Sequence, residues 1–187
     1  MTPTRRLDAS RDEYEPFPDV ARRNLMQQSL EVPALIRLLD LPRGGNVLEV
    51  GCGRGVALPP LARLLTPSRL VGLDIDGDLV EVARERLDER EVAASLQVGD
   101  VRSMPFAGRS FDTVIDFGTC HHIANSELAL REIVRVLRPG GLFVAETVTS
   151  QLLSHPFRSR GQRLPWREAP ELTVIKGRLL WKVRTRS

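Results

Sequence analysis

A buried strand that runs directly into three alternating glycines constrains this chain more than any other feature. The strand residues Val47-Leu48-Glu49-Val50 precede Gly51-Cys52-Gly53-Arg54-Gly55. Glycines let a ligand lie against the backbone, and the amides that open the next helix attract an anionic group. A dinucleotide fingerprint needs glycine or alanine where Val56 stands, and the chain has no Gly-Lys-Ser/Thr of a P-loop. The loop therefore predicts a ligand site that is neither a dinucleotide nor a P-loop site.

Short apolar runs alternate with helical patterns through the middle of the chain. Leu79, Ala83 and Leu87 share one helical face, and a second helix follows near residues 126–137. The expected strands are 46–50, 69–74, 95–100, 111–116 and 141–147. This alternation predicts an α/β fold: a doubly wound, Rossmann-like sheet of five parallel strands with helices on both faces.

Length and composition favour one domain, because a single core usually serves about 100–200 residues and this chain has 187. We divide it into an N-terminal arm and lid helix at 1–40, an α/β core at 41–147, and a basic crossover with a hairpin at 148–187. No apolar run reaches the roughly 18 residues that span a bilayer. Cys52 and Cys120 are too few to staple a secreted domain of this size. We therefore expect a cytoplasmic protein.

The two ends of the chain differ from its core. At the start, Val32-Pro33 should interrupt a helix over roughly residues 19–40. At the end, apolar runs at 172–175 and 179–185 flank a Lys-Gly-Arg turn and predict an antiparallel hairpin. Residues 158–187 hold nine basic and two acidic side chains. This end can attract phosphates, nucleic acid or an anionic membrane surface, although a solvated arginine-rich face is the simpler interpretation.

Five motifs stand in the order typical of one family and extend over residues 46–147. They are E-x-G-x-G-x-G at 49–55, an acid-ended strand at 70–76, Gly-Asp at 99–100, MPF with SFD at 104–112, and LRPGG at 137–141. In this order the chain resembles class I S-adenosylmethionine-dependent methyltransferases, in particular the small-molecule branch with the quinone-biosynthesis enzymes. A lone glycine loop is weak evidence, whereas five ordered motifs are specific. The resemblance implies methyl transfer from S-adenosylmethionine to an oxygen, nitrogen or carbon atom of a small molecule.

The resemblance also assigns parts of the cofactor to particular residues. Asp74 would accept from the ribose hydroxyls, and its alternative role is a helix cap. Asp100 would accept from the adenine amino group beside the Val101 amide, and its alternative is a turn aspartate. Glu49 would organise the loop or receive the methionine ammonium through water. The expected cofactor-binding residues are Glu49, Gly51, Cys52, Gly53, Gly55, Asp74, Ile75, Asp100, Val101, Asp116 and Phe117.

Two histidines, His121 and His122, follow the fourth expected strand and are the candidate catalytic residues. A histidine there can take a proton from the acceptor, because its ordinary pKa lies near neutral pH. The alternative is that they cap or pack the next helix. Because the methyl donor is already activated, positioning can supply most of the catalysis without an essential base.

Departures from the family pattern concern the surroundings of the pocket. Pro59-Pro60 should make the helix after the glycine loop begin late. The crossover after the fifth strand is short and rich in proline, which puts substrate closure in question. Tyr14 and Phe17 belong to an arm that can fold over the pocket or form a disordered tail.

Other chemistries are minor hypotheses. Cys52 and Cys120 could form a thiol-rich mouth for a soft metal or a thiol, but the chain lacks Cys-x-x-Cys, and we expect no resident metal. The chain also lacks Asn/Asp-Pro-Pro-Tyr after the fourth strand, which argues against nucleic acid as the acceptor. We therefore expect a small-molecule acceptor, anionic or held at an anionic membrane surface. A cofactor-binding regulatory module and another transferase of the same nucleoside, such as an aminopropyl transferase, are the alternatives.

Overall fold

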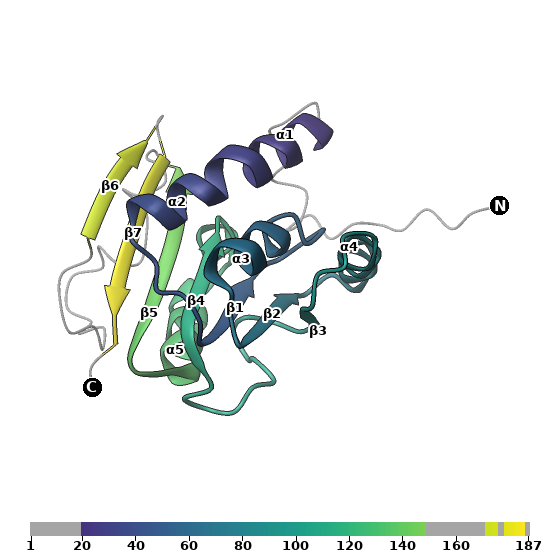
Figure 1. Ribbon diagram of the computed structural model, residues 1–187. Coiled ribbons are helices and arrows are strands. Elements are labelled where there is room, and N and C mark those ends of the chain that lie inside the picture. Colours follow the sequence, from purple (N-terminus) through teal and green to yellow (C-terminus); the bar gives the residue numbers. More distant parts are fainter. Residues whose placement is uncertain (1–19, 149–170, 176–177, 186–187) are drawn as a thin grey trace.

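A single seven-stranded sheet organises the computed structural model, which describes residues 20–148, 171–175 and 178–185 (Figure 1). The strand order is β3-β2-β1-β4-β5-β7-β6. The strands are β1 (Asn46–Val50), β2 (Arg69–Asp74), β3 (Ser95–Val98), β4 (Phe111–Phe117), β5 (Leu137–Val148), β6 (Glu171–Ile175) and β7 (Arg178–Arg184). The first five pair in parallel, and β7 pairs antiparallel with both β5 and β6. The predicted α/β sheet and terminal hairpin are both confirmed.

Helices cover the two faces of this sheet. They are α1 (Val20–Met26), α2 (Val32–Leu38), α3 (Leu58–Leu65), α4 (Gly77–Glu89) and α5 (Ser126–Val136). Alternate residues of each strand enter opposite layers. Leu48 of β1 packs in the layer of α5, whereas its neighbour Val47 packs in the layer that holds α2 and α3.

The fifth strand begins earlier than its sequence predicts. We expected a turn at 138–141, but β5 begins at Leu137 and passes through these residues as an irregularity of register. Phe111 pairs with Leu137, while Thr113 pairs with Leu142. Thr185 fixes this bulge, since its hydroxyl donates to the Arg138 carbonyl at 2.8 Å. The partner that stabilises the bulge therefore comes from the far end of the chain.

Prolines shape both helical regions in which we expected irregularities. Before Pro33, a π-helical turn at Gln27–Glu31 joins α1 to α2, and the Val32 amide donates to the Gln27 carbonyl. This wide turn sits where the proline ring would crowd an α-helical carbonyl. Helix α3 begins only at Leu58, three residues after Gly55, so Pro59 and Pro60 occupy its first turn. Backbone amides in the first turn of a helix have no helical acceptor, so the N–H that each proline lacks costs no hydrogen bond there.

The basic end of the chain contributes two described cations to the fold. Lys182 donates to the Leu39 carbonyl at 2.7 Å and ties β7 to the end of α2. Arg184 donates to the Gly140 carbonyl at 3.2 Å. The basic crossover around Arg158, like Tyr14 and Phe17 of the N-terminal arm, lies outside the described residues. Among the helices that the structure describes, none has the length and apolar character needed to cross a membrane.

Candidate functional site

A cavity of about 350 Å³ opens where the parallel strands end. Open α/β sheets bind ligands at this edge, and the volume falls within the range of small-molecule sites. Its lining comes from the ends of four neighbouring strands: Gly51, Leu73, Asp74, Ile75, Gly99, Asp100, Val101, Arg102, Thr119, His122, Ile123 and Ala124. Five of the predicted cofactor-binding residues and one predicted histidine are in this set. Glu49, Cys52, Gly53, Gly55, Asp116 and Phe117 are not.

The glycine loop is held by β2 rather than by its own strand. The amides of Gly51 and Cys52 both donate to the Leu73 carbonyl, at 2.7 and 3.0 Å. Gly51 has a φ of +68°, and a Cβ built on it would overlap the side chain of Thr119. Gly53 has a φ of +49° with no atom within 4 Å of its Cβ position. The loop thus leaves open space beside Gly53, into which a ligand can approach the backbone.

Asp74 joins the glycine loop to the end of β2. One carboxylate oxygen accepts from the Gly53 amide at 2.7 Å, and the other accepts from the Asp76 amide at 2.9 Å. Helix α4 is capped by Asp76, which accepts from the amides of Asp78 and Leu79. The helix-cap role that was open for Asp74 therefore belongs to Asp76. Asp74 instead lines the cavity with its carboxylate already oriented by two amides.

Glu49 is a buried carboxyl group with an unused acceptor. Its exposed fraction is 2%, and its Oε2 accepts no hydrogen bond. Burial raises the pKa of Glu49 well above its usual range, and the nearby charges of Asp74 and Asp116 raise it further. Both charges that shift this pKa are carboxylates, and no cation is among its causes. Such an edge suits a ligand that brings a positive charge or a donor.

Asp100 follows β3 in the turn that closes the other side of the cavity. Its carboxylate accepts from the Arg102 amide at 2.8 Å and forms an ion pair with the Arg102 guanidinium at 2.7 Å. This pairing holds the pKa of Asp100 below its ordinary value. The carboxylate therefore stays ionised as an acceptor, beside the Val101 backbone that also lines the cavity.

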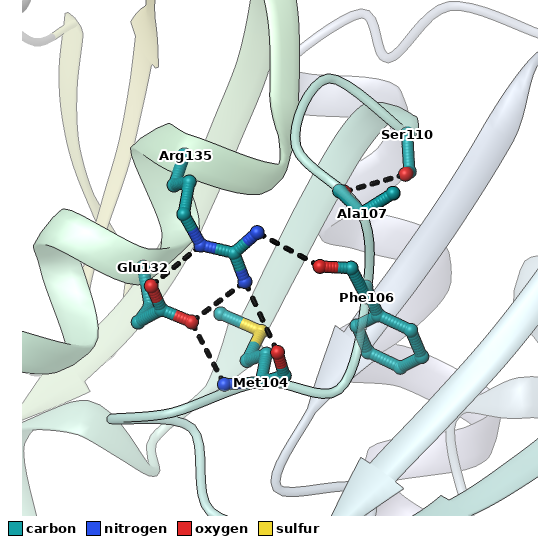
Figure 2. Close-up of polar contacts among 6 residues, drawn as sticks. All are labelled: Met104, Phe106, Ala107, Ser110, Glu132 and Arg135. Atoms are coloured by element: carbon teal, nitrogen blue, oxygen red, sulfur yellow. Dashed lines mark hydrogen bonds and ion pairs between the residues drawn. The ribbon is translucent and has the colours of Figure 1, made fainter.

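Helix α5 clamps the segment that follows Asp100, as Figure 2 shows. Glu132 accepts from the Met104 amide at 2.8 Å and pairs with Arg135 at 2.6 Å. Arg135 in turn donates to the carbonyls of Met104 and Phe106, at 3.0 and 2.8 Å. These bonds fix the long connection between β3 and β4, so the cavity wall at Asp100 is joined to a helix.

The turn after β4 carries the remaining wall. Asp116 is buried and accepts from the amides of Thr119 and Cys120, at 2.6 and 3.0 Å. Burial raises its pKa despite these bonds. A short 3-10 helix, η2 (Cys120–His122), follows, and residues three apart in such a turn share a face. Thr119 and His122 accordingly both line the cavity, while only the backbone of His121 is described.

The two thiols do not form a mouth. Cys52 packs in the layer of α2 and α3, with its sulfur 2.9 Å from the position of a Cβ on Gly72. Cys120 packs in the opposite layer with α5. Burial raises the pKa of both thiols. The hypothesis of a thiol-rich mouth is therefore wrong. The described part of the chain holds no group of three or more potential metal ligands.

Sequence reasoning missed half of the cavity lining. The additional residues are Leu73, Gly99, Arg102, Thr119, Ile123 and Ala124. Each stands within two residues of a predicted site residue, so position along the strand ends carried a signal. The direction of the Thr119 and Arg102 side chains carried no such signal, because it depends on the conformation of the turns after β4 and β3.

A glycine loop and acidic strand ends on a doubly wound sheet define the class I methyltransferase fold. A family model described as a methyltransferase domain matches residues 48–145, and the chain belongs to this family. Family membership implies use of S-adenosylmethionine.

Individual relatives differ in what they act on. A fatty-acid O-methyltransferase of Mycolicibacterium smegmatis is 37% identical over 101 residues, covering 54% of this chain and 36% of that protein. A Mus musculus protein named "Probable tRNA methyltransferase 9B" is 31% identical over 135 residues, covering 71% of this chain and 28% of that protein. The chain thus spans about a third of the length of these curated relatives.

A solved structure matches along nearly the whole chain. The PH0226 protein from Pyrococcus horikoshii OT3 has a TM-score of 0.69 at 23% identity, covering 90% of this chain and 93% of that chain. At this identity the likeness concerns the fold. It agrees with the mostly parallel sheet and the antiparallel strands at its end.

Proposed function

We propose that the protein transfers a methyl group from S-adenosylmethionine to a small molecule. The observation that carries the proposal is the arrangement of Asp74, whose carboxylate lines the cavity while holding the glycine loop at Gly53. When bound, S-adenosylmethionine supplies a methyl group activated by the positive sulfonium. Asp74 would accept from the ribose hydroxyls, because a carboxylate oxygen retains acceptor capacity after one amide bond.

The other ends of the ligand meet matching groups. Asp100 and the Val101 amide offer one acceptor and one donor to adenine, in the turn that α5 clamps. The free Oε2 of Glu49 offers an acceptor for an ammonium group through water. These groups fit an adenosyl amino acid at its base, sugar and amino group. The other predicted cofactor-binding residues, including Phe117 and Cys52, would act through their backbone.

His122 is our choice for a proton acceptor at the methyl-accepting atom. It lines the cavity on the wall that follows β4, and an imidazole takes protons near neutral pH. Thr119 on the same face would help to orient the acceptor. His121 stays a second candidate from the sequence. Positioning by these walls would carry most of the catalysis, since the donor is already activated.

We further infer an anionic or membrane-presented acceptor and a cytoplasmic protein. The arginines at 158, 160, 163 and 167 support an anionic acceptor by their charge alone. Both cysteines are free and buried, which fits a reducing compartment. Helix α1, with the arm before it, would serve as the lid, because α2 is packed in the core. A cofactor-binding module without turnover is the second candidate, favoured by the short crossover after β5.

Asp74→Asn tests the ligand site, with Asp76→Asn, two residues further along, as the matched control. We expect Asp74→Asn to weaken binding of S-adenosylhomocysteine about 10- to 100-fold by calorimetry, because charge-assisted bonds to the sugar are lost. Asp76→Asn should leave binding within about threefold, because Asp76 caps α4 and is not among the residues that line the cavity. Equal affinities for wild type and Asp74→Asn would refute the site. A screen of small acceptors and RNA with labelled methyl donor then separates the enzyme from the module.

A further inference from the structure

Arg102 lies across the cavity from one wall to the other. Its Nη2 pairs with Asp100 at 2.7 Å, and its Nη1 donates to the Ala124 carbonyl at 3.4 Å. Asp100 belongs to the wall after β3, whereas Ala124 belongs to the wall between η2 and α5. All three residues line the same cavity. The side chain therefore joins two walls that approach the ligand space from different strands.

We propose that Arg102 is a latch that controls passage of the adenosyl ligand into and out of the cavity. The proposal rests on the proposed function, because it takes the adenosyl ligand as the occupant. The guanidinium donates to two groups of the protein on different walls, the Asp100 carboxylate and the Ala124 carbonyl. In this role the side chain holds the two walls together, and the measured rates distinguish it from a residue that contacts the ligand directly.

Whether Arg102 contacts the walls or the ligand determines which rate constants change when its side chain is removed. Contacts made between two walls must break whenever a ligand passes, whether it enters or leaves. Removing them lowers the barrier in both directions and leaves the equilibrium constant nearly unchanged. A residue that bound the ligand directly would instead change the dissociation rate and the affinity together.

The geometry of the pair makes the latch specific to arginine. Nε and Nη2 of Arg102 both reach the Asp100 carboxylate, at 3.0 and 2.7 Å, while Nη1 remains for Ala124. Lysine offers one compact ammonium and cannot hold both walls with the same fork. The two side chains are 34% and 31% exposed, so salt should weaken the pair.

The test measures rates of S-adenosylhomocysteine binding to the immobilised full chain by surface plasmon resonance. We expect Arg102→Ala to raise both association and dissociation rates about fivefold, with the equilibrium constant within about threefold of wild type. Arg102→Lys should resemble Arg102→Ala. Arg84→Ala removes an exposed ion pair with Glu81 on α4. It should leave both rates unchanged, because neither residue lines the cavity.

Salt provides a measurement on the unaltered protein. Raising ionic strength should speed both rates in wild type and have little effect in Arg102→Ala, so the two proteins converge. Unchanged rates in a folded Arg102→Ala, a change of dissociation alone, or tighter binding would each overturn the latch. If wild type itself fails to bind S-adenosylhomocysteine, the proposed function falls and the latch with it.

Discussion

Acidic side chains have different partners at the two edges of the parallel sheet, the amino edge where the strands begin and the carboxyl edge where they end. At the amino edge, Asp112 accepts from the Asn46 amide and from Arg138, each at 2.7 Å. Burial alone would raise the pKa of Asp112, but these bonds outweigh it and hold the pKa below its ordinary value. At the carboxyl edge, Glu49 and Asp116 are buried and their pKa values are raised. Asp112 is paired with an arginine, whereas no arginine is among the causes that shift the pKa of Glu49 or Asp116.

The difference separates stability from binding. An acid paired with arginine stabilises the folded chain whether or not a ligand is present. A buried acid without a cation costs folding free energy, which a cationic ligand can return on binding. The cavity lies at the carboxyl edge, beside these buried acids, in agreement with the proposed sulfonium ligand. Substitutions of acids at the two edges should therefore change the stability of the fold in opposite directions, and those at the carboxyl edge should also change ligand binding.

The largest expected effect compares one glycine from each edge. Gly51 at the carboxyl edge and Gly44 at the amino edge have similar φ values, +68° and +76°. A Cβ on Gly51 would overlap Thr119, whereas a Cβ on Gly44 meets nothing within 4 Å. We expect Gly51→Ala to destabilise the fold by about 3 kcal/mol or more and to abolish ligand binding. Gly44→Ala should cost only about 1 kcal/mol.

Urea unfolding and calorimetry measure the two effects. The comparison requires both variants, because each carries the same strain from a positive φ and only one carries the overlap. Equal losses of stability would mean that Thr119 moves aside freely, and the tight contact at the cavity would then lose its significance.

The second prediction concerns Glu49→Gln. A raised folded pKa means that the ionised carboxylate is disfavoured in the folded state, so wild type loses stability as pH rises above the ordinary glutamate pKa. The neutral amide avoids this loss. We expect Glu49→Gln to be more stable than wild type by about 1 kcal/mol at pH 7, and to bind the adenosyl ligand about tenfold more weakly.

The outcome is checked by unfolding curves at pH 5 and pH 7 beside ligand titrations. The gain in stability should be larger at pH 7. A variant that is less stable at both values would show that Glu49 is bonded as a structural acceptor, and the contrast between the edges would fail at this residue.

Features set by neighbouring residues could be predicted, and those set by distant partners could not. The strands β1 and β2 have the bounds that their apolar runs predict, because a parallel strand buried on both faces is a run of consecutive apolar residues. The late start of α3 follows from Pro59 alone. The bulge in β5 depends on Thr185, 47 residues beyond Arg138, and no local pattern records that pairing.

The candidate site divides in the same way. Asp74 and Asp100 could be placed because acids at strand ends meet at one edge of a parallel sheet. The contact of Arg102 with Ala124 joins residues 22 apart through two turns. The separation of the thiols also needed the structure, since Cys52 and Cys120 leave neighbouring strands toward opposite layers.

The smallest expected effect returns to the paired acids, at Glu132 in the clamp on α5. The hydrogen bonds from Arg135, with a further bond from the Met104 amide, hold the pKa of Glu132 below its ordinary value. A depressed carboxyl pKa contributes stability that is present above the unfolded pKa, near 4.3, and is lost as pH falls through the folded value. Glu132→Gln should therefore be less stable than wild type by about 0.5–1 kcal/mol at pH 7, the sign opposite to that at Glu49.

Unfolding at pH 7 and at pH 3 measures this difference in stability, and the two proteins should converge at the lower pH. Because the side chain is 19% exposed, salt should reduce the difference only in part. A difference that persists unchanged at pH 3 would mean that the clamp depends on the shape of the Glu132 side chain rather than on its charge.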